Sequence, residues 1–269
     1  MTSNNPAQST ARAAQDSSVL RIAARIGYIV LGVLHILIGV IAISIATGGG
    51  GTADQSGAME EIQQSPAGVA LLWVIVLGLL ALTVWQIAEA LVERDPDAKK
   101  RWAHRAKFVG TAAAYVAIAG TALVYALGGR SESSDSSQSL SAQLMSVPAG
   151  VILLVILGLV VAAIGIAFIV RGIARAFEKH LDLPSGAAKK GIVGFGVVGY
   201  IAKGIAVAVA GVLFVVAAIT HDPETAGGLD AALRALAGLP FGAIILWIVG
   251  AGLVLYGLFC FARARYARM

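Results

Sequence analysis

Two ionisable side chains lie inside long apolar stretches of this sequence, where a polar group needs a reason to be present. His35 is about ten residues into the first stretch, and Lys203 is near the beginning of the fifth. Burial away from water is costly for such groups, so they are the first candidates for chemistry. His35 could relay protons or contact a solute in a central cavity, but an imidazole hydrogen-bonded to a neighbouring helix is the simpler interpretation. For Lys203 the simpler interpretation is a side chain that reaches the membrane headgroups.

A proline-led apolar phrase occurs three times, as SPAGVALLW, VPAGVILLV and LPFGAIILW. Its prolines are Pro66, Pro148 and Pro240. Alignment on these prolines puts a charged residue at the twenty-third following position of each copy. The three residues are Glu89, Arg171 and Arg263. If the copies surround one axis, these side chains could converge as a salt-bridged gate near the cytoplasmic surface. The competing interpretation, favoured by the positive-inside rule, is two arginines that anchor helix ends and one solvated acid.

A third candidate is the basic segment RGIARAFEKHL, which follows the fourth apolar stretch. We expect the helix to continue through it, which would place Arg171, Arg175 and Lys179 on one face. Each basic residue at a membrane surface attracts anionic lipid by about 1 kcal/mol. These residues are therefore candidate contacts for anionic lipids at the cytoplasmic face, although orientation alone explains most of their charge.

Signals for an enzyme are weak. The histidines are His35, His104, His180 and His221, and they show no metal-binding spacing. Nucleophile-elbow, phosphate-loop and dinucleotide motifs are absent from the sequence, so we expect no enzyme activity, cofactor or metal. The one cysteine, Cys260, is expected to be a small buried residue. The net charge is +5, but we expect no soluble domain that could present it to a nucleic acid, so nucleic-acid binding is not expected.

Composition predicts an integral membrane protein. Hydrophobic residues make up 58% of the 269 residues and charged residues only 13%, too few to cover a soluble core of this size. Six apolar stretches have about the 20 residues that a helix needs to cross a bilayer. They span residues 26–46, 66–88, 108–127, 148–170, 198–219 and 240–262. The fold expected is all-α, with six transmembrane helices.

The distribution of charge predicts the orientation. Of 20 lysines and arginines, only Arg130 and Arg234 fall in the loops between the odd and even stretches, which hold eight of the 15 acids. By the positive-inside rule, both termini and the two basic connections face the cytoplasm of a plasma (inner) membrane. Residues 1–18 are expected to be a polar, disordered cytoplasmic tail.

The repeated unit is two helices joined by an outer loop. We divide the chain into residues 19–97, 98–182 and 183–269, three units that enter the membrane in the same orientation and could form a pseudo-threefold bundle. Each outer loop has apolar residues at helical spacing just before its proline, which predicts a short interfacial helix; Asp230 is well placed to cap the third. Glycines on the fourth and fifth helices favour close packing.

The segment GLDAALRALAGLPFG, followed by GLVLYG, and the GY pairs that open the first and third units resemble a bacterial membrane family, the domain of unknown function 1206. The middle unit keeps Gly110 of the GY pair but not the tyrosine. The resemblance implies three two-helix units, and it implies no activity, substrate or site residue.

Two classes of function remain open. One is a transporter or channel for a small solute, an ion or a lipid, with a central cavity between the repeats. The other is a non-catalytic scaffold or accessory subunit that packs with partner membrane proteins or lipids. We favour the first, which the repeats and the intramembrane His35 suggest, and keep the second as the alternative, which the glycine-rich faces suggest.

Overall fold

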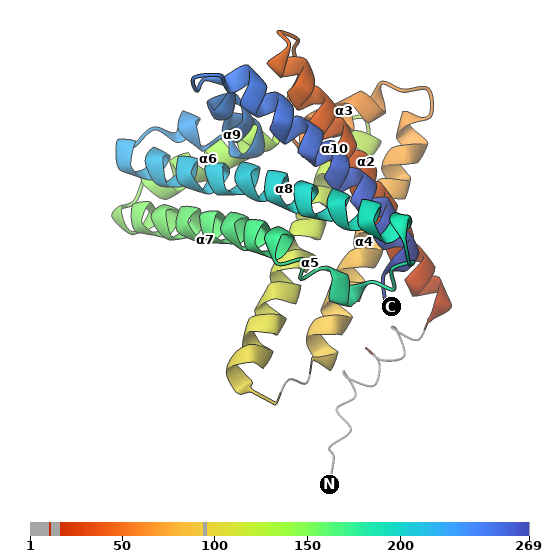
Figure 1. The fold of residues 1–269 in the computed structure, drawn as a ribbon. Coiled ribbons are helices and arrows are strands. Elements are labelled where there is room, and N and C mark those ends of the chain that lie inside the picture. The colour runs from red at the N-terminus through yellow and green to blue at the C-terminus, as the bar shows by residue number, and fades with distance from the viewer. Residues whose placement is uncertain (1–10, 12–16, 94–95, 269) are drawn as a thin grey trace.

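The computed structural model describes residues 11, 17–93 and 96–268, so most of the predicted tail at 1–18 lies outside the described residues. Its described part contains six helices long and apolar enough to cross a membrane, as predicted. They are α2 (Ser18–Ala46), α4 (Gly68–Val92), α5 (Ala98–Ala126), α7 (Pro148–Ile173), α8 (Ala187–Thr220) and α10 (Gly242–Tyr266). The protein is therefore an all-α, multi-pass membrane protein (Figure 1).

Short helices precede the even membrane helices, as the sequence predicts. They are α3 (Gln55–Gln63), α6 (Ser133–Met145) and α9 (Gly228–Ala237); two 3-10 turns are η1 (Glu178–His180) and η2 (Pro223–Ala226). The expected cap at Asp230 is wrong. Gly227 is the N-cap of α9, and Asp230 lies in its first turn with its carboxylate turned toward another loop.

The proline-led phrase forms the same turn in all three units. The residue before each proline accepts a hydrogen bond from the glycine two residues after it, at 2.9, 2.9 and 2.7 Å. These glycines are Gly68, Gly150 and Gly242. A Cβ atom on any of them would overlap a carbonyl oxygen at the end of the preceding short helix. Pro148 begins α7, whereas Pro66 and Pro240 lie two residues before their helices. The phrase is thus a tight turn that presses each short helix onto its membrane helix.

Close glycine contacts join α10 to α2 and α7 to α8, whereas no glycine contact joins α4 to α5 among the described residues. A Cβ on Gly39 of α2 would lie 2.5 Å from the carbonyl oxygen of Gly250 in α10. The α7–α8 pair repeats this contact, because a Cβ on Gly158 would lie 2.8 Å from the oxygen of Gly211. In lipid, close backbone approach of this kind supplies the packing that hydrophobicity cannot. The predicted glycine faces of the fourth and fifth helices are therefore packing surfaces.

The three units form a ring with one open position. The even helix of each unit packs on the odd helix of the next, giving the pairs α4–α5, α7–α8 and α10–α2. Within the first and third units, α2 also packs on α4 and α8 on α10. Within the middle unit, the described helices α5 and α7 barely touch. Figure 1 shows the α7–α8 pair steeply inclined to the α4–α5 pair.

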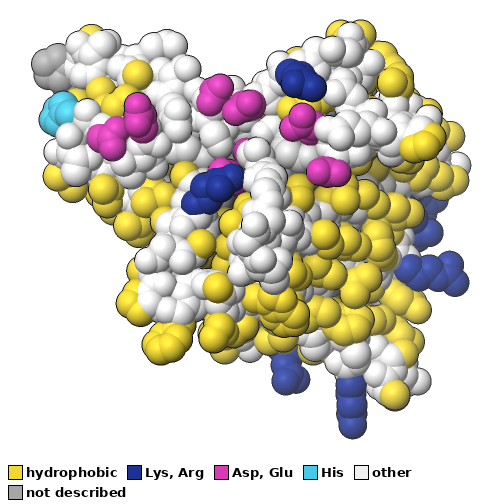
Figure 2. Space-filling model, turned by 90° about the horizontal axis from the view of Figure 1, so that it is seen from above, with side chains coloured by type: hydrophobic (Ala, Val, Ile, Leu, Met, Phe, Trp, Pro, Cys, Tyr) yellow, Lys and Arg dark blue, Asp and Glu magenta, His cyan; other side chains and the backbone are white. Residues whose placement is uncertain are grey.

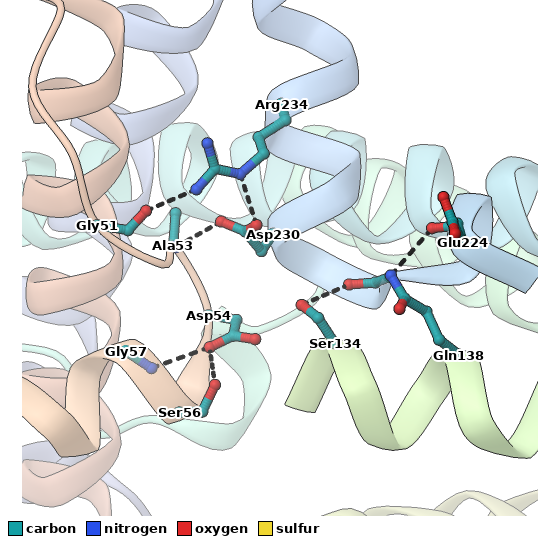
Figure 3. Close-up of polar contacts among 11 residues, drawn as sticks. Gly51, Ala53, Asp54, Ser56, Gly57, Ser134, Gln138, Glu224, Asp230 and Arg234 are labelled. Carbon is teal, nitrogen blue, oxygen red and sulfur yellow. Dashed lines mark hydrogen bonds and ion pairs between the residues drawn. The ribbon is translucent and has the colours of Figure 1, made fainter. Parts of the chain in front are cut away.

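Charged and polar groups from all three units meet at the end of the ring that carries the short helices. The Asp230 carboxylate accepts from Ala53 N and from Arg234 Nε, each at 2.7 Å, and Arg234 also donates to the Gly51 carbonyl (Figure 3). The middle unit joins through Ser134, which donates to the Gly227 carbonyl. We call this network the clamp.

Asp54, the N-cap of α3, is more deeply buried than Asp230, the other buried acid at the clamp. Its Oδ1 accepts from Gly57 N at 3.0 Å and from the hydroxyl of Ser56, whereas Oδ2 is buried without a partner. Burial raises the pKa of Asp54, and the nearby Asp230 adds to this; the two hydrogen bonds oppose it. The charged form of Asp54 therefore destabilises the folded protein relative to the neutral form.

Charge is segregated in space. Figure 2 shows a face with several acidic side chains gathered on it, while lysines and arginines project mainly from its edges. The acids of the three short-helix loops lie at the clamp end; the basic connections lie at the other end, which we call the basic end. This separation is the basis of the orientation proposed below.

The glycine contacts predict a sharp contrast between two substitutions. Gly39→Ala should lower the thermal unfolding midpoint, because overpacking at a close contact costs about 1–3 kcal/mol. Gly120→Ala on α5 meets open space, so it should be neutral or stabilise the helix by up to about 1 kcal/mol. Melting of both variants in one detergent checks this, and equal midpoints would contradict the packing role of Gly39.

The buried Asp54 predicts a pH effect with a defined sign. A carboxyl with a raised pKa binds more protons in the folded state, so its unfavourable contribution grows as pH rises through the shifted pKa. Asp54→Asn removes the buried charge, so it should raise the free energy of unfolding at neutral pH by about 1–3 kcal/mol and give little gain at about pH 4. Asp135→Asn, at an exposed acid of α6, is the control and should show neither effect.

Candidate functional site

Basic side chains from four elements share one region at the basic end of the ring. They are Lys107 of α5, Arg171 of α7, Lys179 and His180 of η1, and Arg263 of α10. Each lies within electrostatic range of others in this set. We call the set the cation cluster. The sequence predicted Arg171 and Arg263 as gate residues and Lys179 as a lipid contact, and the structure adds Lys107 and His180.

Arg263 is held on the first helix of the chain. Its guanidinium lies 4.3 Å from the centre of the Tyr28 ring, and Nη2 lies 3.1 Å from the Tyr28 hydroxyl oxygen. The side chain is partly buried, although the positive-inside rule alone requires only that it reach water. Exposed Arg265 and Arg268 nearby already meet that requirement.

Arg171 makes the equivalent contact in the next pair of helices. Its guanidinium lies 5.7 Å from the centre of the Tyr200 ring, and its Nε is buried without a hydrogen-bond partner. Tyr28 and Tyr200 are the tyrosines of the two GY pairs. The repeat alignment therefore relates two arginine–tyrosine contacts, each between an even helix and the odd helix of the next unit.

Glu89 occupies the third equivalent position, and its environment differs. The residue that replaces the GY tyrosine in α5 is Thr111. Glu89 lies within electrostatic range of Lys107 and Glu93. Among the described residues, no ion pair joins Glu89 to Arg171 or Arg263. The salt-bridged gate is therefore not formed in this structure: the arginines contact tyrosines instead.

The predicted basic stripe is also wrong. Helix α7 ends at Ile173, and Arg175 follows with a left-handed backbone, φ 51°. The chain then turns into η1, so Arg171, Arg175 and Lys179 do not share one helix face. Arg175 and Lys179 are exposed, whereas Arg171 turns inward onto Tyr200.

Lys203 and His35 meet at one aromatic ring deeper in the membrane. The Lys203 ammonium lies 4.5 Å from the centre of the Tyr256 ring and 5.3 Å from that of Phe168. The His35 ring lies 4.7 Å from the Tyr256 ring, and Nδ1 is 2.7 Å from the carbonyl oxygen of Leu31. The hydrogen-bond partner of His35 is thus in its own helix and not in a neighbour. Lys203 turns toward α7 and α10 and not to the headgroups.

Packed aromatic rings connect this deeper pair to the arginines. Tyr256 and Tyr200 meet edge to face at 5.2 Å, and Tyr200 stacks on Phe177 at 5.4 Å. Lys203 touches the first of these rings and Arg171 lies over the second. A continuous series of contacting rings and cations therefore extends from Lys203 to Arg171 at the basic end.

His180 lies in a region of positive electrostatic potential. Partial loss of water and, after it, the cations Arg171, Lys107, Lys179 and Arg263 together lower the pKa of His180 to about 4. Loss of water and the nearby positive charges both favour the neutral imidazole. Neither His180 nor Lys107 was predicted from the sequence, since both stand in basic segments whose charge the orientation rule already explains. Both residues lie outside the segments aligned on the repeated proline, so the alignment did not relate them to Arg171 and Arg263.

The chemistry of this region favours an anionic ligand. Among the described residues, no ion pair within 4.0 Å joins a carboxylate to Lys107, Arg171, Lys203 or Arg263. The described residues hold no group of three His, Cys, Asp or Glu side chains placed to bind a metal. Guanidinium and ammonium groups with free donors suit phosphate or carboxylate groups.

Comparison with known proteins agrees with the three-unit architecture. A protein of Bacillus subtilis (strain 168) described as Uncharacterized protein YxxB is 32% identical over 250 residues, which cover 91% of this chain and 90% of that protein. No solved structure matched the chain. The model of the family described as Domain of Unknown Function (DUF1206) matches three times, at residues 26–93, 106–175 and 198–267. One match falls in each two-helix unit, and the chain belongs to the DUF1206 family.

Proposed function

We propose that this protein is a membrane carrier for an anionic substrate, which binds at the cation cluster. The observation that carries the proposal is the inward orientation of Arg171, Arg263 and Lys203, none of which has a carboxylate partner among the described residues. Small anionic solutes and anionic lipid headgroups both have the required chemistry.

The energetic balance at the arginines favours binding of an anion. Moving an ionised side chain out of water costs several kcal/mol. A cation–π contact returns about 0.5–2 kcal/mol, so Tyr28 beneath Arg263 and Tyr200 beneath Arg171 offset only part of that cost. A bound phosphate or carboxylate would supply the rest. Inward-facing cations in a membrane protein are for this reason a mark of a substrate path.

The proposed orientation places the cation cluster on the cytoplasmic side of a plasma membrane. Eight acids and only two basic residues, Arg130 and Arg234, lie in the loops of the clamp end, whereas the basic connections lie at the opposite end. The positive-inside rule then puts both termini in the cytoplasm. The cluster faces the cytoplasm and the clamp covers the other side.

A non-catalytic scaffold is the competing function. It would need the cation–π contacts only for packing, so neutral isosteres at Arg171 and Arg263 would change stability without changing the response to anions. The two functions therefore differ in a measurable property, the dependence of anion binding on these side chains.

Anion binding tests the carrier directly. We expect at least one of inorganic phosphate, pyrophosphate, glycerol 3-phosphate and succinate to raise the unfolding midpoint of the protein in detergent. Arg263→Gln should weaken that anion at least tenfold, which corresponds to about 1.4 kcal/mol. The active anion should also exchange with its radiolabelled form across phosphatidylcholine proteoliposomes.

The matched control is Arg175→Gln, which removes an exposed guanidinium of the same end and should leave the affinity unchanged. Absence of any response to the four anions, or an unchanged affinity in Arg263→Gln, would contradict the proposal and favour the scaffold.

Cysteine labelling tests the orientation. Cys260 is buried, so replacing it with serine gives a background without an accessible thiol. In that background Gly50→Cys, at an open position of the clamp end, should react with a membrane-impermeant maleimide applied to intact spheroplasts. Ala103→Cys, exposed at the basic end, should react only after lysis. The reverse pattern would place the cation cluster outside.

A further inference from the structure

The first and third units show how closely the two helices of a unit pack, and the opening between α5 and α7 can be compared with them. The glycine that begins the GY pair packs against the even helix of its own unit: a Cβ on Gly27 would lie 2.4 Å from the Gly78 oxygen, and one on Gly199 would lie 2.6 Å from Tyr256 Cα. The equivalent Gly110 has no atom within 4 Å of its Cβ position. By the repeat relation, Gly110 faces the place that α7 would occupy.

The same opening is visible from α7. The residue twelve positions after the proline is Gly78 in the first unit and Gly252 in the third, and both pack closely on another helix. In the middle unit it is Val160, whose surface is 51% exposed. Gly110 and Val160 therefore mark the two walls of an apolar opening, which we call the seam.

The seam leads to the cation cluster at the basic end. On α5, Lys107 lies three residues before Gly110, which puts both on one helix face. On α7, Arg171 lies eleven residues after Val160, about three turns, and so on the same face. Lys107 and Arg171 are also within electrostatic range of each other. Each wall of the seam thus ends in a cation.

We infer that the seam is a lateral binding site for one anionic phospholipid, with its phosphate at Lys107 and Arg171 and its acyl chains between α5 and α7. This inference rests on the anion binding proposed above, and it identifies the substrate class as anionic phospholipids. A soluble anion needs only the cations. An apolar opening continuous with them, along two membrane helices that face lipid, suits a molecule that carries both a phosphate and long apolar chains.

Charge complementarity favours a lipid over a second copy of this chain. Two copies joined through their seams would bring the cations of one seam wall close to those of the other copy, and like charges repel. The partly buried Arg171 has an Nε without a partner, which a phosphate oxygen can satisfy.

The test compares three probes on the full chain purified in detergent: dioleoyl phosphatidylglycerol, dioleoyl phosphatidylcholine and glycerol 3-phosphate, followed by native mass spectrometry and by thermal melting. We expect phosphatidylglycerol to bind at least tenfold more tightly than phosphatidylcholine. Val160→Trp, which fills the seam, should weaken phosphatidylglycerol at least tenfold while leaving the response to glycerol 3-phosphate unchanged. Arg171→Gln should weaken both anionic probes.

The matched control is Leu159→Trp, whose position is 57% exposed and lies about 100° around the helix from Val160. It should bind phosphatidylglycerol like the wild type. Gly110→Phe fills the seam from α5 and repeats the test if Val160→Trp folds poorly.

Equal affinity for the two lipids, or equal effects of the two tryptophans, would overturn the lipid site. A response to glycerol 3-phosphate without a preference for phosphatidylglycerol would leave a carrier of soluble anions. No response to any anionic probe would overturn both proposals, and a change of oligomeric state in Val160→Trp alone would assign the seam to a second copy.

Discussion

Apolar side chains gain little by leaving lipid for one another, so the position of each helix here depends on how closely backbones can approach. Contacts such as Gly39 on Gly250 and Gly158 on Gly211 bring a helix of one unit against a helix of the next. These contacts hold two of the three places where neighbouring units meet, and α4 and α5 pack without one among the described residues. Every later feature, from the arginine–tyrosine pairs to the opening in the ring, depends on the order of helices around the ring.

The middle unit departs from the others in a coherent way. Where the outer units have glycine at the odd–even contact of their own helices, the middle unit has Val160; where they have the GY tyrosine, it has Thr111. The even helix that precedes it in the ring carries Glu89 in place of arginine. Loss of the ring partner and loss of the cation occur together, because the arginine of one unit lies over the tyrosine of the next.

Hydropathy and the repeated proline were sufficient to predict the helices, the units and the short loop helices, since each depends on a local pattern. The pairing of units was not predictable, because it depends on which glycine meets which carbonyl across the ring. The same holds for the site. Alignment found Arg171 and Arg263, but their tyrosine partners lie on other helices, and the end of α7 at Ile173 depends on a left-handed residue, Arg175, that no local signal marked.

The broken symmetry has an electrostatic consequence. In a complete threefold ring, three arginines would each lie over a tyrosine and no gap would separate the helices of any unit. Here the acid at position 89 lies near Lys107 of the next helix, so positive charge gathers on the side of α7 and α10. Because the ring is also open between α5 and α7, that charge lies where the packing ends. An anion can therefore approach the arginines without separating any of the glycine contacts that hold the units together.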